Sequence, residues 1–118
     1  MRRDAAFLDD IVQACDQIRQ ICQGGNAEEV EADPVVRAAL LHHLTVIGEA
    51  AARLSEELRA AHSSLPWPEI ISQRNRIVHA YFGLDWALIW HSATRGVPEL
   101  QRWAQEILRD EFPDEGTS

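Results

Sequence analysis

The chain has 118 residues, 46% of them hydrophobic, which is enough for one buried core and too little for two ordinary domains. Nineteen carboxylates against eleven arginines, with no lysine, give a formal net charge of -8. Such an acidic surface repels phosphate chains at long range, which disfavours a protein that coats nucleic acid, so any RNA contact must be local. Residues 70–84 form a local exception, because they include two arginines and a histidine and no Asp or Glu.

The cysteines and the apolar runs indicate the cellular compartment in which the protein is expected. Cys15 and Cys22 are seven positions apart on one predicted helix. That spacing is a rise of about 10 Å, beyond the reach of a disulfide, so we expect two reduced core thiols. The sequence has no charged-then-apolar leader, and no apolar run approaches the roughly 18 residues that cross a bilayer. We expect a cytoplasmic protein without membrane contact.

Two long helices are predicted in the first half of the chain. Apolar residues recur every three or four positions from about residue 4 to residue 23, and a Gly-Gly pair then ends the helix. The next segment, AEEVEAD, is polar and acidic and is interpreted as a linker. Asp33 and Pro34 are a preferred N-cap and first helical residue, so a second helix is expected from there to about Ala61.

The second half predicts two more helices. Pro68 favours the start of a third helix, which Gly83 is placed to end. Asp85 can cap a fourth helix. Pro98 has no N–H for the helical ladder and should kink or break that helix near Val97.

Amphipathic helices joined by short loops favour an all-α fold, an antiparallel up-and-down bundle of four to five helices. We assign residues 1–110 to a single helical domain. Residues 111–118 have little apolar surface and are expected to form a disordered acidic tail. The four tryptophans either fill the core or place one or two aromatic rings on a dimer surface, and both interpretations stay open.

One cluster of chemically active side chains lies in the run RNRIVHAYFGLD, which contains Arg74, Asn75, His79 and Tyr81. On a helix, Asn75 and His79 share one face, whereas Arg74 and His79 are about 140° apart. A single helix therefore does not direct Arg74 and His79 at one point. Either the chain turns after the helix, near Tyr81, or a second copy of the chain supplies the missing partner across a two-fold axis.

These residue types suit RNA cleavage by the 2′-hydroxyl of the RNA itself. We assign His79 to proton transfer and Arg74 to stabilising charge on the phosphorus oxygens, with Asn75 orienting the phosphate or the imidazole ring. Neither a metal nor a cofactor is required, and the sequence has no carboxylate cluster to bind a metal. The alternative is structural: the histidine favours the helix dipole, and the ring of Tyr81 only packs.

Glu49 interrupts the apolar second helix within the sequence IGEAA. A buried carboxylate is costly unless it is paired, so Glu49 either faces solvent or meets a cation, for which Arg74 and Arg76 are the candidates. We prefer the pairing, which makes Glu49 and Arg76 possible supporting residues of the site. Gly48 would then allow the two helices to approach closely.

The motif residues and their neighbours resemble the signature of HEPN ribonuclease toxins, in the HepT-like branch. The segments IGEAA and PWPEI match that branch in order, as do Asp85 and Trp90, and the resemblance covers about residues 4–108. It implies an all-helical two-fold dimer whose motif helices meet in a cleft, and metal-independent ribonuclease activity.

The resemblance also implies a partner, a nucleotidyltransferase antitoxin of the MntA kind that transfers AMP to Tyr81. The added phosphate and adenosine would block RNA entry. RNA is the expected substrate, and neither DNA nor a membrane is an expected partner. A second hypothesis stays open, in which the chain is a non-catalytic helical partner or substrate of a minimal nucleotidyltransferase, because an acidic surface suits a basic protein partner.

Overall fold

A computed structural model describes residues 2–113, apart from the side chains of Arg2 and Tyr81. All regular structure in these residues is helical, which confirms the predicted all-α class. The bundle measures 41 × 26 × 20 Å. Its elements in chain order are α1 (Arg2–Gln23), α2 (Ala27–Ala32), α3 (Pro34–Arg53), α4 (Glu56–Ala61), α5 (Trp67–His79), the 3-10 turn η1 (Tyr81–Gly83), α6 (Trp86–His91), the π-helical segment η2 (Ser92–Gly96) and α7 (Val97–Glu111).

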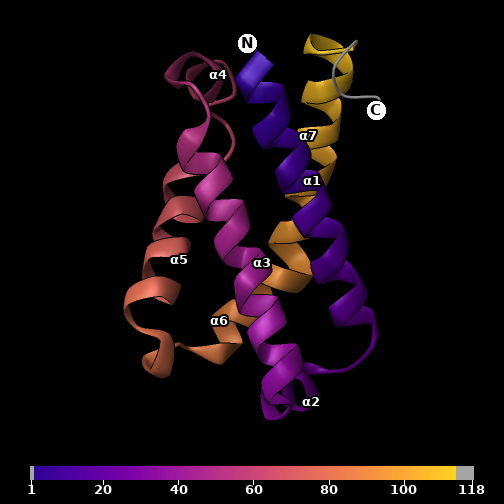
Figure 1. Ribbon diagram of the computed structural model, residues 1–118, viewed down its shortest axis with the longest axis vertical. Helices are drawn as coiled ribbons and strands as arrows, with labels where there is room; N and C mark the ends of the chain where they lie inside the picture. Colours follow the sequence, from indigo (N-terminus) through magenta and orange to yellow (C-terminus); the bar gives the residue numbers. More distant parts are fainter. Residues whose placement is uncertain (1, 114–118) are drawn as a thin grey trace.

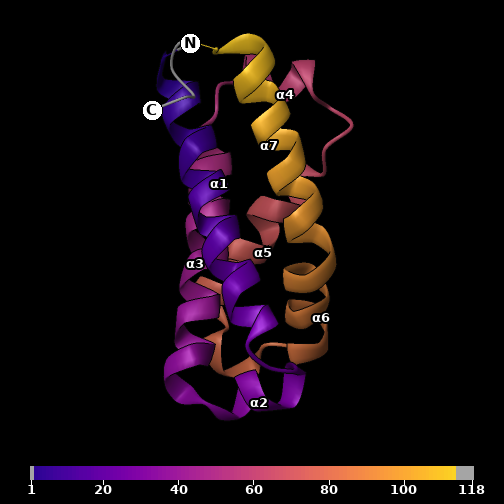
Figure 2. The same ribbon diagram turned by 90° about the vertical axis from the view of Figure 1, so that its right-hand side faces the viewer.

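The long elements alternate in direction, as the prediction of an up-and-down bundle requires (Figure 1). Helix α3 lies centrally and packs against α1 and α5, while α7 packs against α1. The short helices α2 and α4 connect the long ones at opposite ends of the bundle (Figure 1). Turned by 90°, the bundle shows α6, η2 and α7 as one continuous column beside α1 (Figure 2).

The core consists of the predicted apolar stripes. Their periodicity of three and four residues places each stripe on one helical face, where burial of apolar surface stabilises the bundle. The largest of the side chains that are less than 2% exposed come from α1 and α3: Leu8, Ile11, Cys15, Ile18, Leu40 and Leu41. Of the four tryptophans, Trp67 and Trp86 are buried in the core, as one interpretation predicted, and the other two are half-buried against the core, which leaves the dimer-surface interpretation open for them.

Two buried polar side chains join distant parts of the chain. The carboxylate of Asp4, 3% exposed, accepts hydrogen bonds from the backbone N–H and the hydroxyl of Ser55 at 2.8 and 2.6 Å. The amide of Gln101, 2% exposed, accepts from Arg19 and donates to Asp16. Because buried polar groups are costly without partners, these bonds fix α4 and α7 against α1.

The predicted linker before α3 is wrong, because AEEVEA forms helix α2. Asn26 and Glu29 make a reciprocal capping box, in which the Asn26 side chain accepts from the Glu29 N–H and the Glu29 carboxylate accepts from the Asn26 N–H. Val30 is buried in the core. A complete cap and one buried anchor therefore outweigh the polar composition.

The predicted single helix from Asp33 to Ala61 is also wrong in its continuity. Asp33 caps α3 as expected, accepting from two backbone N–H groups. Helix α3 ends at Arg53, since Leu54 has an extended backbone with ψ 146°. Ser55 then caps α4 through its hydroxyl, which accepts from the Leu58 N–H. The interruption follows from the bond of Ser55 to Asp4, a contact that the local apolar pattern does not encode.

The third and fourth helices occur where the sequence predicted them, with some differences at their ends. Helix α5 ends at His79, and Gly83 instead closes the short turn η1. Asp85 caps α6 as predicted, accepting from two N–H groups. Before Pro98 the helix changes type without breaking: the N–H of Val97 donates to the carbonyl of Ser92, which widens the helix into η2. Proline has no N–H for the regular helical hydrogen bond, and the widened turn lets the helix continue without that bond.

Three expectations from composition have different outcomes. Cys15 and Cys22 are free thiols, buried and half-buried, as predicted. Helix α3 is long and apolar enough to cross a bilayer by length and composition alone, although Arg37 and Glu49 interrupt its apolar residues. Its central position against α1 and α5 is also that of a core helix. At the C-terminus, Glu111 belongs to α7 and Phe112 packs on the core, so order extends past the predicted boundary, and residues 114–118 of the predicted tail lie outside the described residues.

Candidate active site

The predicted motif occupies the end of α5 and the first residue of η1. Helix α5 has proline in its first turn, and its C-terminal cap is the Ala80 N–H, which donates to the carbonyl of Arg76. Tyr81 begins η1 two residues after His79, and its side chain lies outside what the structure describes. The chain turns after His79, but His79 itself lies within α5, so the turn does not bring it to Arg74.

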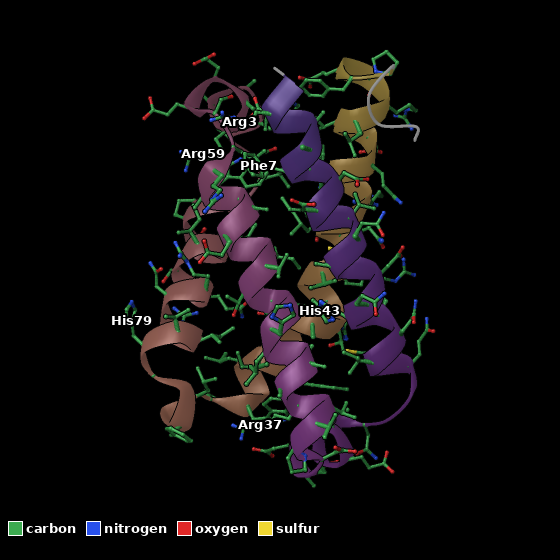
Figure 3. The ribbon with its side chains drawn as sticks, in the orientation of Figure 1. Arg3, Phe7, Arg37, His43, Arg59 and His79 are labelled. Carbon is green, nitrogen blue, oxygen red and sulfur yellow. The ribbon has the colours of Figure 1, made fainter. Side chains whose placement is uncertain are left out.

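Asn75 and His79 lie on the outer face of α5, one turn apart, and both are exposed. Figure 3 shows His79 on the side of α5 that faces away from α3. Arg76 is also exposed, and its Nη1 donates to the Ser72 hydroxyl at 3.1 Å. This serine was not predicted as a site residue, although its spacing of four from Arg76 was a readable signal.

Arg74 lies on a different face, turned toward α3. Its Nη1 donates to Glu49 Oε1 at 2.8 Å, so the predicted pairing of Glu49 with an arginine is confirmed for Arg74. The Arg74 side chain is 23% exposed and that of Glu49 is 45% exposed. The pair is therefore only partly desolvated, and its main effect is to hold the guanidinium in one orientation.

Gly48 explains how α3 and α5 come so close at Arg74. A Cβ at position 48 would lie 2.2 Å from the Arg74 Cβ and 2.8 Å from its Cγ. Side-chain carbons do not approach so closely, so only glycine fits this crossing. The predicted role of Gly48 is confirmed, and the crossing places Arg74 beside Glu49.

The monomer therefore divides the predicted site. It brings Arg74 to Glu49 and leaves Asn75 and His79 together on the outer face. Three exposed apolar side chains occur in the motif run or shortly after it in sequence and were not predicted: Val78, Phe82 and Leu88, which are 53, 97 and 58% exposed. Val78 and Phe82 lie within the motif run itself.

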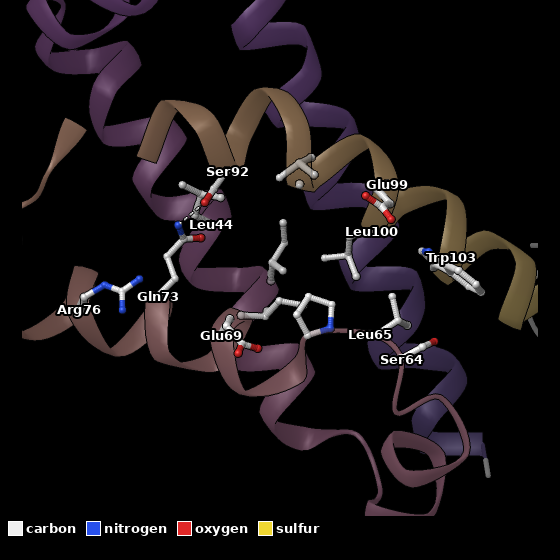
Figure 4. A pocket seen from close by; sticks show the side chains of 15 residues that line it. Leu44, Ser64, Leu65, Glu69, Gln73, Arg76, Ser92, Glu99, Leu100 and Trp103 are labelled. Atoms are coloured by element: carbon white, nitrogen blue, oxygen red, sulfur yellow. Dashed lines mark hydrogen bonds between the residues drawn. The ribbon is translucent and has the colours of Figure 1, made fainter. Parts of the chain in front are cut away.

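An apolar cavity of about 340 Å³ lies on one flank of α5, between that helix, α3 and the column of η2 and α7 (Figure 4). Its lining includes Leu44, Ile47 and Leu100, and the Gln73 amide donates to the Ser92 hydroxyl across it at 2.8 Å. Of the predicted site residues, Arg76 lines this cavity. Asn75 and His79 do not line it, so the cavity is separate from the motif face.

No group of three His, Cys, Asp or Glu side chains gathers at one point within residues 2–113 as described. The motif side chains are instead a guanidinium, a carboxamide and an imidazole on one helix. Such groups can bind a phosphate and transfer a proton.

Comparison with known proteins agrees with this arrangement. A family model described as ribonuclease HepT-like matches residues 11–107, which include the whole motif. The chain is similar to "Putative RNase TTE0752" of Caldanaerobacter subterraneus subsp. tengcongensis, with 35% identity over 94% of this chain and 99% of that protein. It is similar to "Putative RNase MJ1216" of Methanocaldococcus jannaschii, with 30% identity over 89% of this chain and 87% of that protein.

"Probable ribonuclease HepT" of Thermococcus cleftensis is 28% identical over 80% of this chain and 86% of that protein. No solved structure matches the chain. The matched range contains α5 with its motif and the part of α3 that positions Arg74. The chain therefore belongs to the ribonuclease HepT-like family, the HepT-like branch of the HEPN ribonucleases.

Proposed function

We propose that this chain is a metal-independent endoribonuclease and the toxin of a toxin–antitoxin pair. The observation that carries the proposal is the exposed pair Asn75 and His79 on the outer face of α5, the helix whose Arg74 is held by Glu49 on the face toward α3. Membership of the HepT-like family supports ribonuclease chemistry at this motif.

In the proposed reaction, His79 takes the proton of an RNA 2′-hydroxyl. The 2′-oxygen forms a bond to the adjacent phosphorus while the bond from phosphorus to the 5′-oxygen breaks, and the protonated imidazole of His79 returns its proton to the 5′-oxygen. The products are a 2′,3′-cyclic phosphate and a 5′-hydroxyl. Arg74 stabilises the charge on the phosphorus oxygens, and Asn75 orients the phosphate or the imidazole.

A two-fold homodimer would complete the site. In one chain, Arg74 is directed at α3 while His79 is directed outward, so a second copy is the simplest source of the missing partner. The exposed apolar side chains of Val78 and Phe82 in the motif run would supply apolar surface for that contact. Doubling the cationic residues in one cleft would also concentrate positive charge there, within an acidic chain of net charge -8.

The cleavage test uses purified protein and RNA in the presence of EDTA. We expect fragments ending in cyclic phosphate from the wild type and none from His79→Ala or Arg74→Ala. Arg102→Ala removes an equal charge from the exposed side of α7 and serves as the matched control. Cleavage that persists in His79→Ala would exclude the assignment of His79, and loss of cleavage in EDTA that added Mg²⁺ restores would exclude metal independence.

The proposed regulation is AMP transfer to Tyr81 by a nucleotidyltransferase antitoxin. Tyr81 begins the turn η1 two residues after His79, so an AMP group there would add charge and bulk beside the proposed proton donor. Co-expression with a nucleotidyltransferase antitoxin of the MntA kind should add the mass of one AMP to the peptide that contains Tyr81. An unmodified peptide at full antitoxin expression would contradict this regulation.

The alternative is a non-catalytic partner or substrate of a minimal nucleotidyltransferase. The net charge of -8 favours it, because an acidic surface binds a basic protein more readily than RNA. The two functions differ in one result: the alternative predicts the AMP adduct on Tyr81 without RNA cleavage by the unmodified dimer.

A further inference from the structure

A second hollow of about 600 Å³ runs between α4 and α5 and begins at the motif. It lies on the flank of α5 opposite the apolar cavity of Figure 4, on the side of Asn75. We call it the α4–α5 groove. Its polar lining comes from both helices and from the loop that joins them: Glu56, Arg59, Ser63, Ser72 and Asn75. Since Asn75 belongs to both the motif and the groove, a ligand at the motif extends naturally into the groove.

Arg59 is the distinctive side chain in this groove. It is half-buried, and its Nε is buried without a hydrogen-bond partner. Among the described residues no hydrogen bond or ion pair engages its guanidinium, whereas Arg74 is held by Glu49 and Arg76 by Ser72. In a chain with nineteen carboxylates, an arginine placed in a hollow without a partner is available for an anion.

The chemistry of the groove fits a nucleotide. The planar guanidinium of Arg59 matches a phosphate, and the hydroxyls of Ser63 and Ser72 are suited to hydrogen bonds with sugar or phosphate oxygens. Ile71 adds apolar surface against which a base or a ribose can pack. Glu56 lines the same groove, and its negative charge opposes that of an anion. Because the charges of Glu56 and Arg59 balance, a ligand is bound through specific contacts and not through its total negative charge.

We infer that the α4–α5 groove is a subsite for the nucleotide next to the scissile phosphate of single-stranded RNA, with Arg59 binding its phosphate. The inference rests on the proposed ribonuclease function. A duplex is disfavoured, because its closely spaced phosphates meet stronger repulsion from a chain of net charge -8. Arg59 is thus a substrate-binding residue and takes no part in proton transfer.

The test measures binding apart from cleavage. The probe is a fluorescent single-stranded RNA of about eight nucleotides with 2′-O-methyl groups, which removes the nucleophile and keeps the phosphates. Its Kd is measured by fluorescence anisotropy at several salt concentrations for the wild-type protein, Arg59→Ala, Arg59→Lys and Glu56→Gln. Arg102→Ala on the far side of α7 loses the same charge and is the matched control.

We expect Arg59→Ala to raise Kd roughly fivefold to twentyfold, the loss of one charge-assisted phosphate contact. The slope of log K against log salt should fall by about 0.7, because one fewer counterion is released. Arg59→Lys should keep the slope, because the charge is unchanged, and lose part of the affinity, because the lysine ammonium cannot bind a phosphate through two parallel hydrogen bonds as the guanidinium does. Glu56→Gln should lower Kd about twofold to threefold, and Arg102→Ala should change Kd by less than about twofold.

Unchanged Kd and salt slope in a folded Arg59→Ala protein would overturn the inference. Equal weakening by Arg102→Ala would also overturn it, because the effect would then be general electrostatics. If Arg59→Ala does not fold, Glu56→Gln decides, and unchanged affinity in that variant overturns the inference. A wild type that neither binds nor cuts RNA would refute the ribonuclease proposal itself, whereas normal cleavage with unchanged KM in Arg59→Ala would refute the groove alone.

Discussion

Replacement of Gly48 by alanine tests how the crossing of α3 and α5 builds the site. The added Cβ would lie 2.2 Å from the Arg74 Cβ and 3.3 Å from the backbone oxygen of Ile70. Since carbon atoms in contact are about 3.5 to 4.0 Å apart, α3 and α5 must separate by about 1.5 Å at this crossing. Neither atom nearest in α5 is the far end of a flexible side chain, so a rotamer change does not relieve the clash.

The expected loss of stability is the balance of two effects. Overpacking in a close contact costs about 1–3 kcal/mol. Alanine in place of glycine inside a helix contributes about 1 kcal/mol in the other direction. We therefore expect Gly48→Ala to lower the free energy of unfolding by up to about 2 kcal/mol relative to the wild type, and by about 1–3 kcal/mol relative to a glycine-to-alanine change in a helix without a clash. Relative to the wild type, this corresponds to a drop in Tm of up to roughly 10 °C for a domain of this size.

Thermal unfolding followed by circular dichroism measures this change, and RNA cleavage measures its effect on the site. Gly96→Ala is the matched control: Gly96 has helical backbone angles, and nothing lies within 4 Å of an added Cβ there. That variant should be as stable as the wild type or slightly more stable. Gly48→Ala should also reduce cleavage about tenfold to a hundredfold, because displacement of α5 separates Arg74 from Glu49.

A Gly48→Ala protein with the stability of Gly96→Ala would refute the reasoning. It would show that the helices accommodate a methyl group at the crossing without cost. Unchanged cleavage by a destabilised Gly48→Ala protein would refute the narrower claim that the crossing orients Arg74.

Three further predictions concern groups away from the motif. Asp4→Ala should lower the free energy of unfolding by about 2 kcal/mol in urea titration, because the backbone N–H of Ser55 loses its partner; an unchanged midpoint would contradict this. Burial, and then the neighbouring imidazole, lower the pKa of His43 below its ordinary value of 6.5. The unfolded state therefore binds more protons, so stability should fall as the pH drops below about 6.5. Between about pH 7.5 and about pH 5.5, the Tm of His43→Gln should fall less than the Tm of the wild type. Plots of Tm against pH that run parallel for the two proteins would refute the assignment to His43. Burial raises the pKa of the Cys15 thiol to about 12, and that of Cys22 is also raised by burial. Iodoacetamide should therefore label half-buried Cys22 slowly and Cys15 only after unfolding, as mass spectrometry would show.

The helical class, the caps of α3 and α6 and the composition of the motif were readable from the sequence. They depend on interactions within a few residues: an aspartate accepts from the N–H groups two and three positions later, and apolar residues three or four apart share a face. The pairing of Glu49 with an arginine was also predicted, because a carboxylate in an apolar helix requires a partner.

The tertiary structure alone decided three features that matter for function. The interruption between α3 and α4 follows from the bond between Ser55 and Asp4, which are 51 positions apart. The direction of Arg74 follows from the crossing of α3 and α5, and the groove that contains Arg59 exists only because α4 folds back beside α5. The spacing of residues along the chain shows which side chains share a helical face. The three features depend instead on contacts between segments far apart in sequence, and residue spacing carries no information about those contacts.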